Sequence, residues 1–173
     1  PLKFTYLPKI SQNIQRAKNW FESARHEIGY AGDYHYCYCT KSSHFRHVLE
    51  EVLKNNVHLE TSSAYDLDLI KRLAIMKKLD KNQWIICNGF KREKYKQYIS
   101  ELLNDGFVNC IPILDNLTEI DYYLEHVNVP FQVGIRIASD EEPKFGFYTS
   151  RLGVRYNDII SLYAEKIKNN PQV

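Results

Sequence analysis

Apolar residues recur along the chain with two alternating periods. A stripe of apolar side chains at helical spacing predicts an amphipathic helix over residues 10–28, which ends at Gly29. From residue 34 to about residue 168, short apolar and β-branched runs alternate with further helical stripes. The runs predict five strands: Tyr34–Thr40, Val57–Thr61, Trp84–Cys87, Val108–Leu114 and Phe131–Ala138.

The spacing of these runs predicts a repeated strand–helix unit. Their centres, near residues 39, 59, 86, 111 and 135, are 20 to 27 residues apart. This is the pattern of a parallel sheet covered by helices, either a doubly wound open sheet or a (β/α)8 barrel. A barrel needs eight units over about 250 residues, so a barrel chain of this length would hold about five βα units. We expect one α/β domain spanning residues 1–173.

Polar residues at the starts of three stripes predict where helices begin. Ser43 is expected to cap the helix after the first strand. Ser63 with Asp66 resembles a capping box for the next helix, and Asn116 with Glu119 opens a later one.

Alternation along the strands separates a bulky face from a face of small or polar side chains. Lys41, Glu60 and Arg136 fall on the second face, at or near the carboxyl ends of their strands. Ligands and catalytic groups gather at this edge of parallel sheets. In the alternative interpretation, Lys41 is a solvated loop residue and Arg136 is a strand arginine paired with Glu60. In the fifth strand, Ile137 is expected on the bulky face.

Composition narrows the class of protein. The 23 Lys and Arg residues against 21 Asp and Glu residues give a formal charge of +2, which argues against an electrostatic nucleic-acid binder. The sequence has neither an apolar run of membrane-spanning length nor a signal-peptide profile at its start. We therefore expect a soluble cytoplasmic protein with no membrane partner. All four cysteines lie in apolar runs and are interpreted as reduced core thiols, with no metal site.

Several blocks, in order and spacing, resemble the N-terminal half of the barrel in biosynthetic arginine decarboxylases, which are alanine-racemase-like pyridoxal phosphate enzymes. The blocks are Gly29-Tyr30-x-Gly32-x-Tyr34 before Tyr38-Cys39-Thr40-Lys41, then Ile86-Cys87-Asn88-Gly89-Phe90-Lys91, and Leu117-Thr118-Glu119-Ile120-Asp121. The resemblance covers effectively the whole chain. It implies a (β/α)8 barrel of which about five units are present, preceded by the N-terminal helix.

The resemblance also implies roles for the three polar residues. Lys41 matches the lysine that forms the Schiff base with pyridoxal 5'-phosphate, Glu60 matches a polar position near the cofactor, and Arg136 matches the fifth-strand arginine that approaches the cofactor. The implied reaction converts arginine to agmatine and carbon dioxide for polyamine synthesis. Homo-oligomers, and Mg²⁺ in some members, are implied as well.

Other functions stay open at this point. The family's ring-stacking histidine, phosphate loop and acidic partner of the ring nitrogen all lie further along its sequences. A non-catalytic half-barrel is therefore one alternative. Another member of the pyridoxal phosphate barrel family, such as an ornithine or diaminopimelate decarboxylase or a racemase, is a second.

Overall fold

Strands and helices alternate along the part of the chain that the structure describes. The computed structural model describes residues 2, 4–138 and 152–173. Its elements, in chain order, are α1 (Pro8–Ile28), β1 (Cys37–Cys39), α2 (Arg46–Leu53), β2 (His58–Thr61), α3 (Ala64–Ile75), β3 (Ile85–Cys87), α4 (Glu93–Asn104), β4 (Cys110–Leu114), α5 (Glu119–His126), β5 (Gly134–Ile135), α6 (Tyr156–Leu162) and a π-helical turn, η1 (Tyr163–Ile167).

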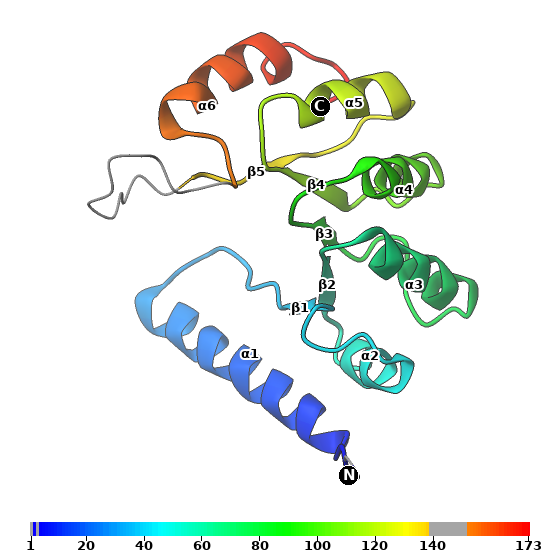
Figure 1. The fold of residues 1–173 in the computed structure, drawn as a ribbon. Helices are drawn as coiled ribbons and strands as arrows, with labels where there is room; N and C mark the ends of the chain where they lie inside the picture. Colours follow the sequence, from blue (N-terminus) through cyan, green and yellow to red (C-terminus); the bar gives the residue numbers. More distant parts are fainter. Residues whose placement is uncertain (1, 3, 139–151) are drawn as a thin grey trace, which may run out of the picture.

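The sheet has five parallel strands in the order β1-β2-β3-β4-β5. A doubly wound sheet reverses its strand order at a switch point, whereas a barrel adds each strand beside the previous one. Helices α2 to α5 lie on one side of the sheet and follow an arc around it (Figure 1). The sequential order and this arc confirm the prediction of a partial (β/α)8 barrel.

The core lies between the sheet and this arc of helices. It contains strand residues such as Leu59 and Ile85, packed with helix residues such as Ile99 and Leu102, all with 0% of their surface exposed. On the other face of the sheet the side chains are only half-buried, as for Cys37, Cys39, His58, Glu60, Ile86, Ile111, Ile113 and Arg136. The alternation predicted for the second strand therefore holds in β2, whereas in β1 the residues of both faces are half-buried and Tyr38 packs against the core.

The prediction for the end of the fifth strand is wrong. Ile137 is 60% exposed, although its alternation with Ile135 predicted a packed position. It forms an isolated parallel bridge with Val154, and the Val154 amide donates to the Arg136 carbonyl. The buried side chains here are those of Val154, which belongs to the core, and Ala138.

Two of the three predicted helix starts match the structure. The Ser63 hydroxyl accepts a hydrogen bond from the Asp66 amide, and the Asn116 side chain accepts from the Glu119 amide at 3.1 Å. The prediction for Ser43 is wrong because α2 begins at Arg46. The Ser43 carbonyl instead accepts a hydrogen bond from the Tyr38 hydroxyl at 3.1 Å, which holds it in the preceding loop.

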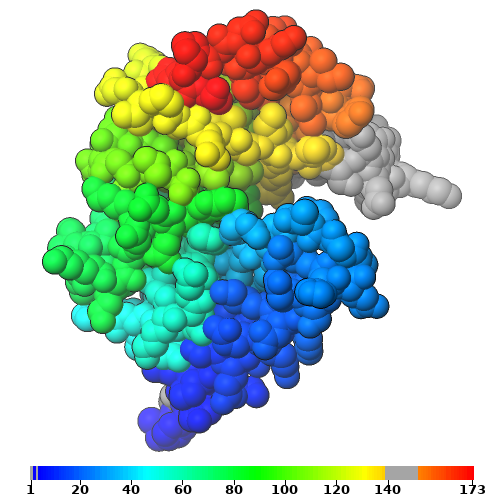
Figure 2. All heavy atoms as spheres, turned by 180° about the vertical axis from the view of Figure 1, so that it is seen from behind, coloured from blue at the N-terminus to red at the C-terminus, as the bar shows by residue number. Residues whose placement is uncertain are grey.

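Helix α1 is packed along only part of its length. It lies beside α2 at the opposite end of the molecule from α6 (Figures 1 and 2). Ile14 is buried, and the Ser11 hydroxyl and the Gln15 amide group bond to side chains of α2 and the residues after it. Further along the predicted apolar stripe, Phe21 is 51% and Ile28 76% exposed. The prediction of a helix from the apolar stripe is therefore confirmed. The stripe is buried only in the N-terminal half of the helix.

The four cysteines are free thiols, but only two lie in the core. Cys87 and Cys110 are fully buried, whereas Cys37 and Cys39 are half-buried on the face that the helices leave open. The prediction of four core thiols is therefore wrong for Cys37 and Cys39, because β1 directs both of them to that face. Within the described residues, no helix combines the length and the apolar character that crossing a membrane would require.

Candidate functional site

The carboxyl ends of the strands carry the polar residues that the sequence singled out. Lys41 is the second residue after β1 and lies in a turn over residues 40–42. Both the amide and the hydroxyl of Thr40 donate to the Glu60 carbonyl, at 2.9 and 3.1 Å, and the Ser42 hydroxyl donates to the Cys39 carbonyl. The turn backbone is thus fixed to β2. The Lys41 side chain is exposed, so the amine is not enclosed by the described residues.

Glu60 lies next to this turn, on the half-buried face of β2. It is paired in register with Cys39, and its carboxylate accepts a hydrogen bond from the Asn88 amide group at 3.1 Å. Burial, together with the negative charge of Glu60, raises the pKa of the Cys37 thiol. The carboxylate is therefore anchored by the residue that follows β3 and faces the same side of the sheet as the thiols of β1.

Arg136 follows β5 at the far edge of the sheet. Its Nη1 lies 3.6 Å from Oδ1 of Asp115, the residue after β4. The alternative pairing of Arg136 with Glu60 is wrong. Strands β3 and β4 lie between β2 and β5, and among the described residues the acidic side chain paired with Arg136 is that of Asp115, directly after the adjacent strand.

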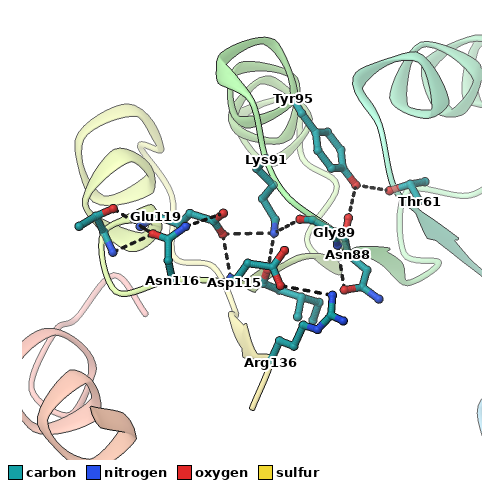
Figure 3. Close-up of polar contacts among 11 residues, drawn as sticks. Thr61, Asn88, Gly89, Lys91, Tyr95, Asp115, Asn116, Glu119 and Arg136 are labelled. Carbon is teal, nitrogen blue, oxygen red and sulfur yellow. Dashed lines mark hydrogen bonds and ion pairs between the residues drawn. The ribbon is translucent and has the colours of Figure 1, made fainter. Parts of the chain in front are cut away.

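A buried lysine, Lys91, also lies at this edge of the sheet, and the sequence analysis gave it no role. Lys91 Nζ donates to the Gly89 carbonyl at 2.9 Å and to the Ile113 carbonyl, and forms an ion pair with Glu119 at 3.2 Å (Figure 3). The Lys91 side chain is 0% exposed. Glu119 also accepts hydrogen bonds from the Asp115 amide and from the Asn116 side chain, each at 3.1 Å. Lys91 therefore joins the loop after β3 to strand β4 and to the start of α5.

The three predicted site residues share one edge of the sheet, but in the described chain no hydrogen bond or ion pair joins any two of their side chains. Lys41 and Glu60 lie on neighbouring strands, whereas Arg136 lies four strand intervals from Lys41. At the usual spacing of about 4.8 Å, this is about 19 Å measured along the sheet. In the same described residues, no cluster of three or more His, Cys, Asp or Glu side chains could hold a metal ion.

The Lys41 amine and the Glu60 carboxylate lie toward one end of this edge, and the Arg136 guanidinium lies toward the other. A primary amine can react with a carbonyl group, and a guanidinium can bind an anion. The fold of this chain is shared by solved structures of longer proteins. One is the biosynthetic arginine decarboxylase SpeA from Campylobacter jejuni, with a TM-score of 0.66 and 20% identity over 91% of this chain and 25% of that one. Another is a lysine decarboxylase from Selenomonas ruminantium, with a TM-score of 0.62 and 16% identity over 91% of this chain and 36% of that one.

Sequence comparison gives the particular relatives. The chain is similar to biosynthetic arginine decarboxylases from Phocaeicola vulgatus, with 25% identity over 88% of this chain, and Pasteurella multocida, with 24% identity over 94% of this chain. It spans about a quarter of the length of these curated relatives, 26% in both cases. No family model matches the chain. The resemblance that the sequence blocks indicated is confirmed as a similarity to the biosynthetic arginine decarboxylases.

Proposed function

We propose that this chain forms the first part of the barrel of a pyridoxal 5'-phosphate-dependent amino-acid decarboxylase that converts arginine to agmatine and carbon dioxide. The observation that carries the proposal is the position of Lys41, Glu60 and Arg136 at the carboxyl ends of strands in a sequential parallel sheet. The names of the relatives support decarboxylation and, among the possible substrates, arginine.

The residues present fit the cofactor in their chemistry. An aldehyde needs a primary amine, and the Lys41 amine has no hydrogen-bond or ion-pair partner among the described residues. An anionic group needs donors, and Arg136 offers N–H groups beyond the one that faces Asp115. When bound, pyridoxal phosphate supplies an electron sink for the carbanion that the loss of carbon dioxide leaves behind.

The three predicted site residues each have a role in this proposal. Lys41 binds the cofactor through its amine, on a turn that Thr40 fixes to β2. Glu60, held by Asn88, orients the amine or a water molecule beside it. The Arg136 guanidinium stabilises negative charge on the ligand electrostatically.

The test is a titration of the purified chain with pyridoxal 5'-phosphate, followed by visible absorption. The chain is expected to develop a band that Lys41→Ala abolishes. The matched control is Lys78→Ala, which removes another exposed lysine, from the loop between α3 and β3. A band that survives Lys41→Ala, or one lost equally in Lys78→Ala, would contradict the role of Lys41.

The exposure of Lys41 favours a second candidate function, a half-barrel that does not bind the cofactor by itself. The described residues leave the Lys41 side chain exposed, and none of them gives its amine a hydrogen-bond or ion-pair partner that would hold it in place. This candidate predicts no band in the wild-type chain. Carbon dioxide release from arginine by the 173-residue chain would exclude it.

A further inference from the structure

The carboxylate of Asp115 is a buried acceptor without a donor. Its side chain is 1% exposed, and within the described part of the chain neither Oδ1 nor Oδ2 accepts a hydrogen bond. Buried polar atoms nearly always have such a partner, and a buried charge without compensation is costly. Among the described residues, the positive charge that faces this carboxylate is that of Arg136, at 3.6 Å, which is longer than a hydrogen bond. The interaction between the two side chains is therefore electrostatic.

The fold fixes the position of Asp115 independently of the arginine. The Asp115 amide donates to Glu119 at 3.1 Å, and its carbonyl accepts from the Gly153 amide at 3.0 Å. Glu119 is itself held by the buried amine of Lys91. The carboxylate thus projects from a backbone tied to Glu119 of α5 and, through Glu119, to Lys91 (Figure 3). The hydrogen bond from Gly153 ties the same backbone to the segment before Val154.

The Arg136 side chain, unlike that of Asp115, is not held in place by burial. The Arg136 amide is fixed by a hydrogen bond to the Leu114 carbonyl at 3.0 Å, but the side chain is long and 40% exposed. A guanidinium has five N–H donors, and in the described chain Nη1 is the group facing Asp115. The fixed, buried carboxylate of Asp115 therefore sets the position of the Arg136 guanidinium and leaves the other N–H donors of the guanidinium available.

We propose that Asp115 is a positioning residue that holds the Arg136 guanidinium at the carboxyl edge of β4 and β5, with its free N–H groups available to an anionic ligand. This inference rests on the proposed function for the identity of the ligand, which is the phosphorylated cofactor. It assigns Asp115 no contact with the ligand itself.

The test compares Asp115→Asn with the matched control Asp121→Asn. Asp121 lies on α5, six residues further on, and its exposed carboxylate pairs with Lys166 at 2.7 Å. In the chain without any ligand, NMR relaxation of the Arg136 Nε–H group reports the order of this side chain. We expect Asp115→Asn to lower that order and Asp121→Asn to leave it unchanged. Unchanged order in Asp115→Asn would overturn the proposal, because a merely structural role for Asp115 predicts no specific release of Arg136.

Ligand binding gives a second readout that separates this inference from the proposed function. Loss of a charge-assisted contact predicts that Asp115→Asn weakens binding of pyridoxal 5'-phosphate about tenfold, with no change in Asp121→Asn. Equal affinity in Asp115→Asn and the wild type would overturn the proposal. If the wild-type chain binds no pyridoxal phosphate, the proposed function fails for this chain, while the order of Arg136 still decides the positioning role.

A further pair of variants keeps the inference testable if Asp115→Asn does not fold. Arg136→Gln leaves the buried carboxylate without compensation and is expected to lower the unfolding midpoint. Adding Asp115→Asn to Arg136→Gln removes that charge and is expected to raise the midpoint again. A double variant no more stable than Arg136→Gln would overturn the electrostatic coupling on which the proposal rests.

Discussion

Replacing Lys91 with methionine removes a cation whose side chain is 0% exposed and which joins the loop after β3 to strand β4 and to the start of α5. Methionine has a similar length, so the change removes charge and hydrogen bonds more than volume. The Gly89 and Ile113 carbonyls lose their donor, and the Glu119 carboxylate, itself 5% exposed, loses its counter-ion.

The structure allows the cost to be worked out. Removing one partner of a buried ion pair costs about 3–5 kcal/mol because the other charge stays buried. Glu119 keeps hydrogen bonds from the Asp115 amide and the Asn116 side chain, which places the expected loss at the lower end, about 3 kcal/mol. Against a typical free energy of unfolding of about 5–15 kcal/mol, this is a large fraction.

Urea denaturation followed by tryptophan fluorescence measures the loss. The matched control, Lys54→Met, breaks the exposed pair with Glu51 and is expected to cost less than about 1 kcal/mol. Adding Glu119→Gln to Lys91→Met removes the stranded charge and is expected to recover part of the loss. A cost below about 1 kcal/mol for Lys91→Met, or a double variant less stable than Lys91→Met, would refute the reasoning.

Three further predictions concern other parts of the fold. Burial, together with the charges of His35 and Lys18, lowers the pKa of His58 from its ordinary value of 6.5, so the unfolded chain binds this proton more readily. The free energy of unfolding is therefore expected to fall as the pH drops below 6.5, and His58→Gln should flatten that slope. Gly153→Ala is expected to cost more stability than Gly134→Ala, because Gly153 has a φ of +98° and its added Cβ would lie 2.8 Å from a backbone nitrogen, whereas Gly134 would meet the end of a flexible side chain. Tyr95→Phe removes the buried hydroxyl that lies 2.9 Å from Thr61 and is expected to cost about 1 kcal/mol.

Denaturation series check all three predictions. A pH slope that persists unchanged in His58→Gln would contradict the assignment to this histidine, whose Nδ1 accepts the Trp84 amide and cannot do so when protonated. Equal losses for the two glycine variants would contradict the argument from φ and backbone contact. A Tyr95→Phe variant as stable as the wild type would mean that the hydroxyl's hydrogen bond contributes no net stability.

The parallel sheet was predictable because each strand carries its own apolar run at a regular interval. The strands in the structure are shorter than the apolar runs, because some residues of a run contact other elements instead of extending the strand. Tyr34 was predicted in the first strand, yet it stacks on Phe21 of α1 with ring centroids 4.0 Å apart. Phe131 was predicted in the fifth strand, yet its amide donates to the Gln172 carbonyl. The periodicity shows that these positions are apolar, but it does not show which part of the fold each side chain contacts.

The candidate site was predictable only in part. Lys41, Glu60 and Arg136 could be placed at the carboxyl edge because alternation and strand ends are local properties. The partner of Arg136 could not, because Asp115 lies 21 residues earlier and meets it only across adjacent strands. Lys91 was missed because lysine is normally exposed. The one signal for it was a lysine four residues after the third strand, together with a carboxylate at the start of α5, Glu119.

The central claim is that Lys41 binds the cofactor, and peptide mapping tests it most directly. The chain is incubated with pyridoxal 5'-phosphate, reduced with borohydride, digested, and analysed by mass spectrometry. The account predicts one major pyridoxyl-labelled peptide, with the label on Lys41. Label on Lys91 or spread evenly over the exposed lysines, with Lys41 unmodified, would contradict it.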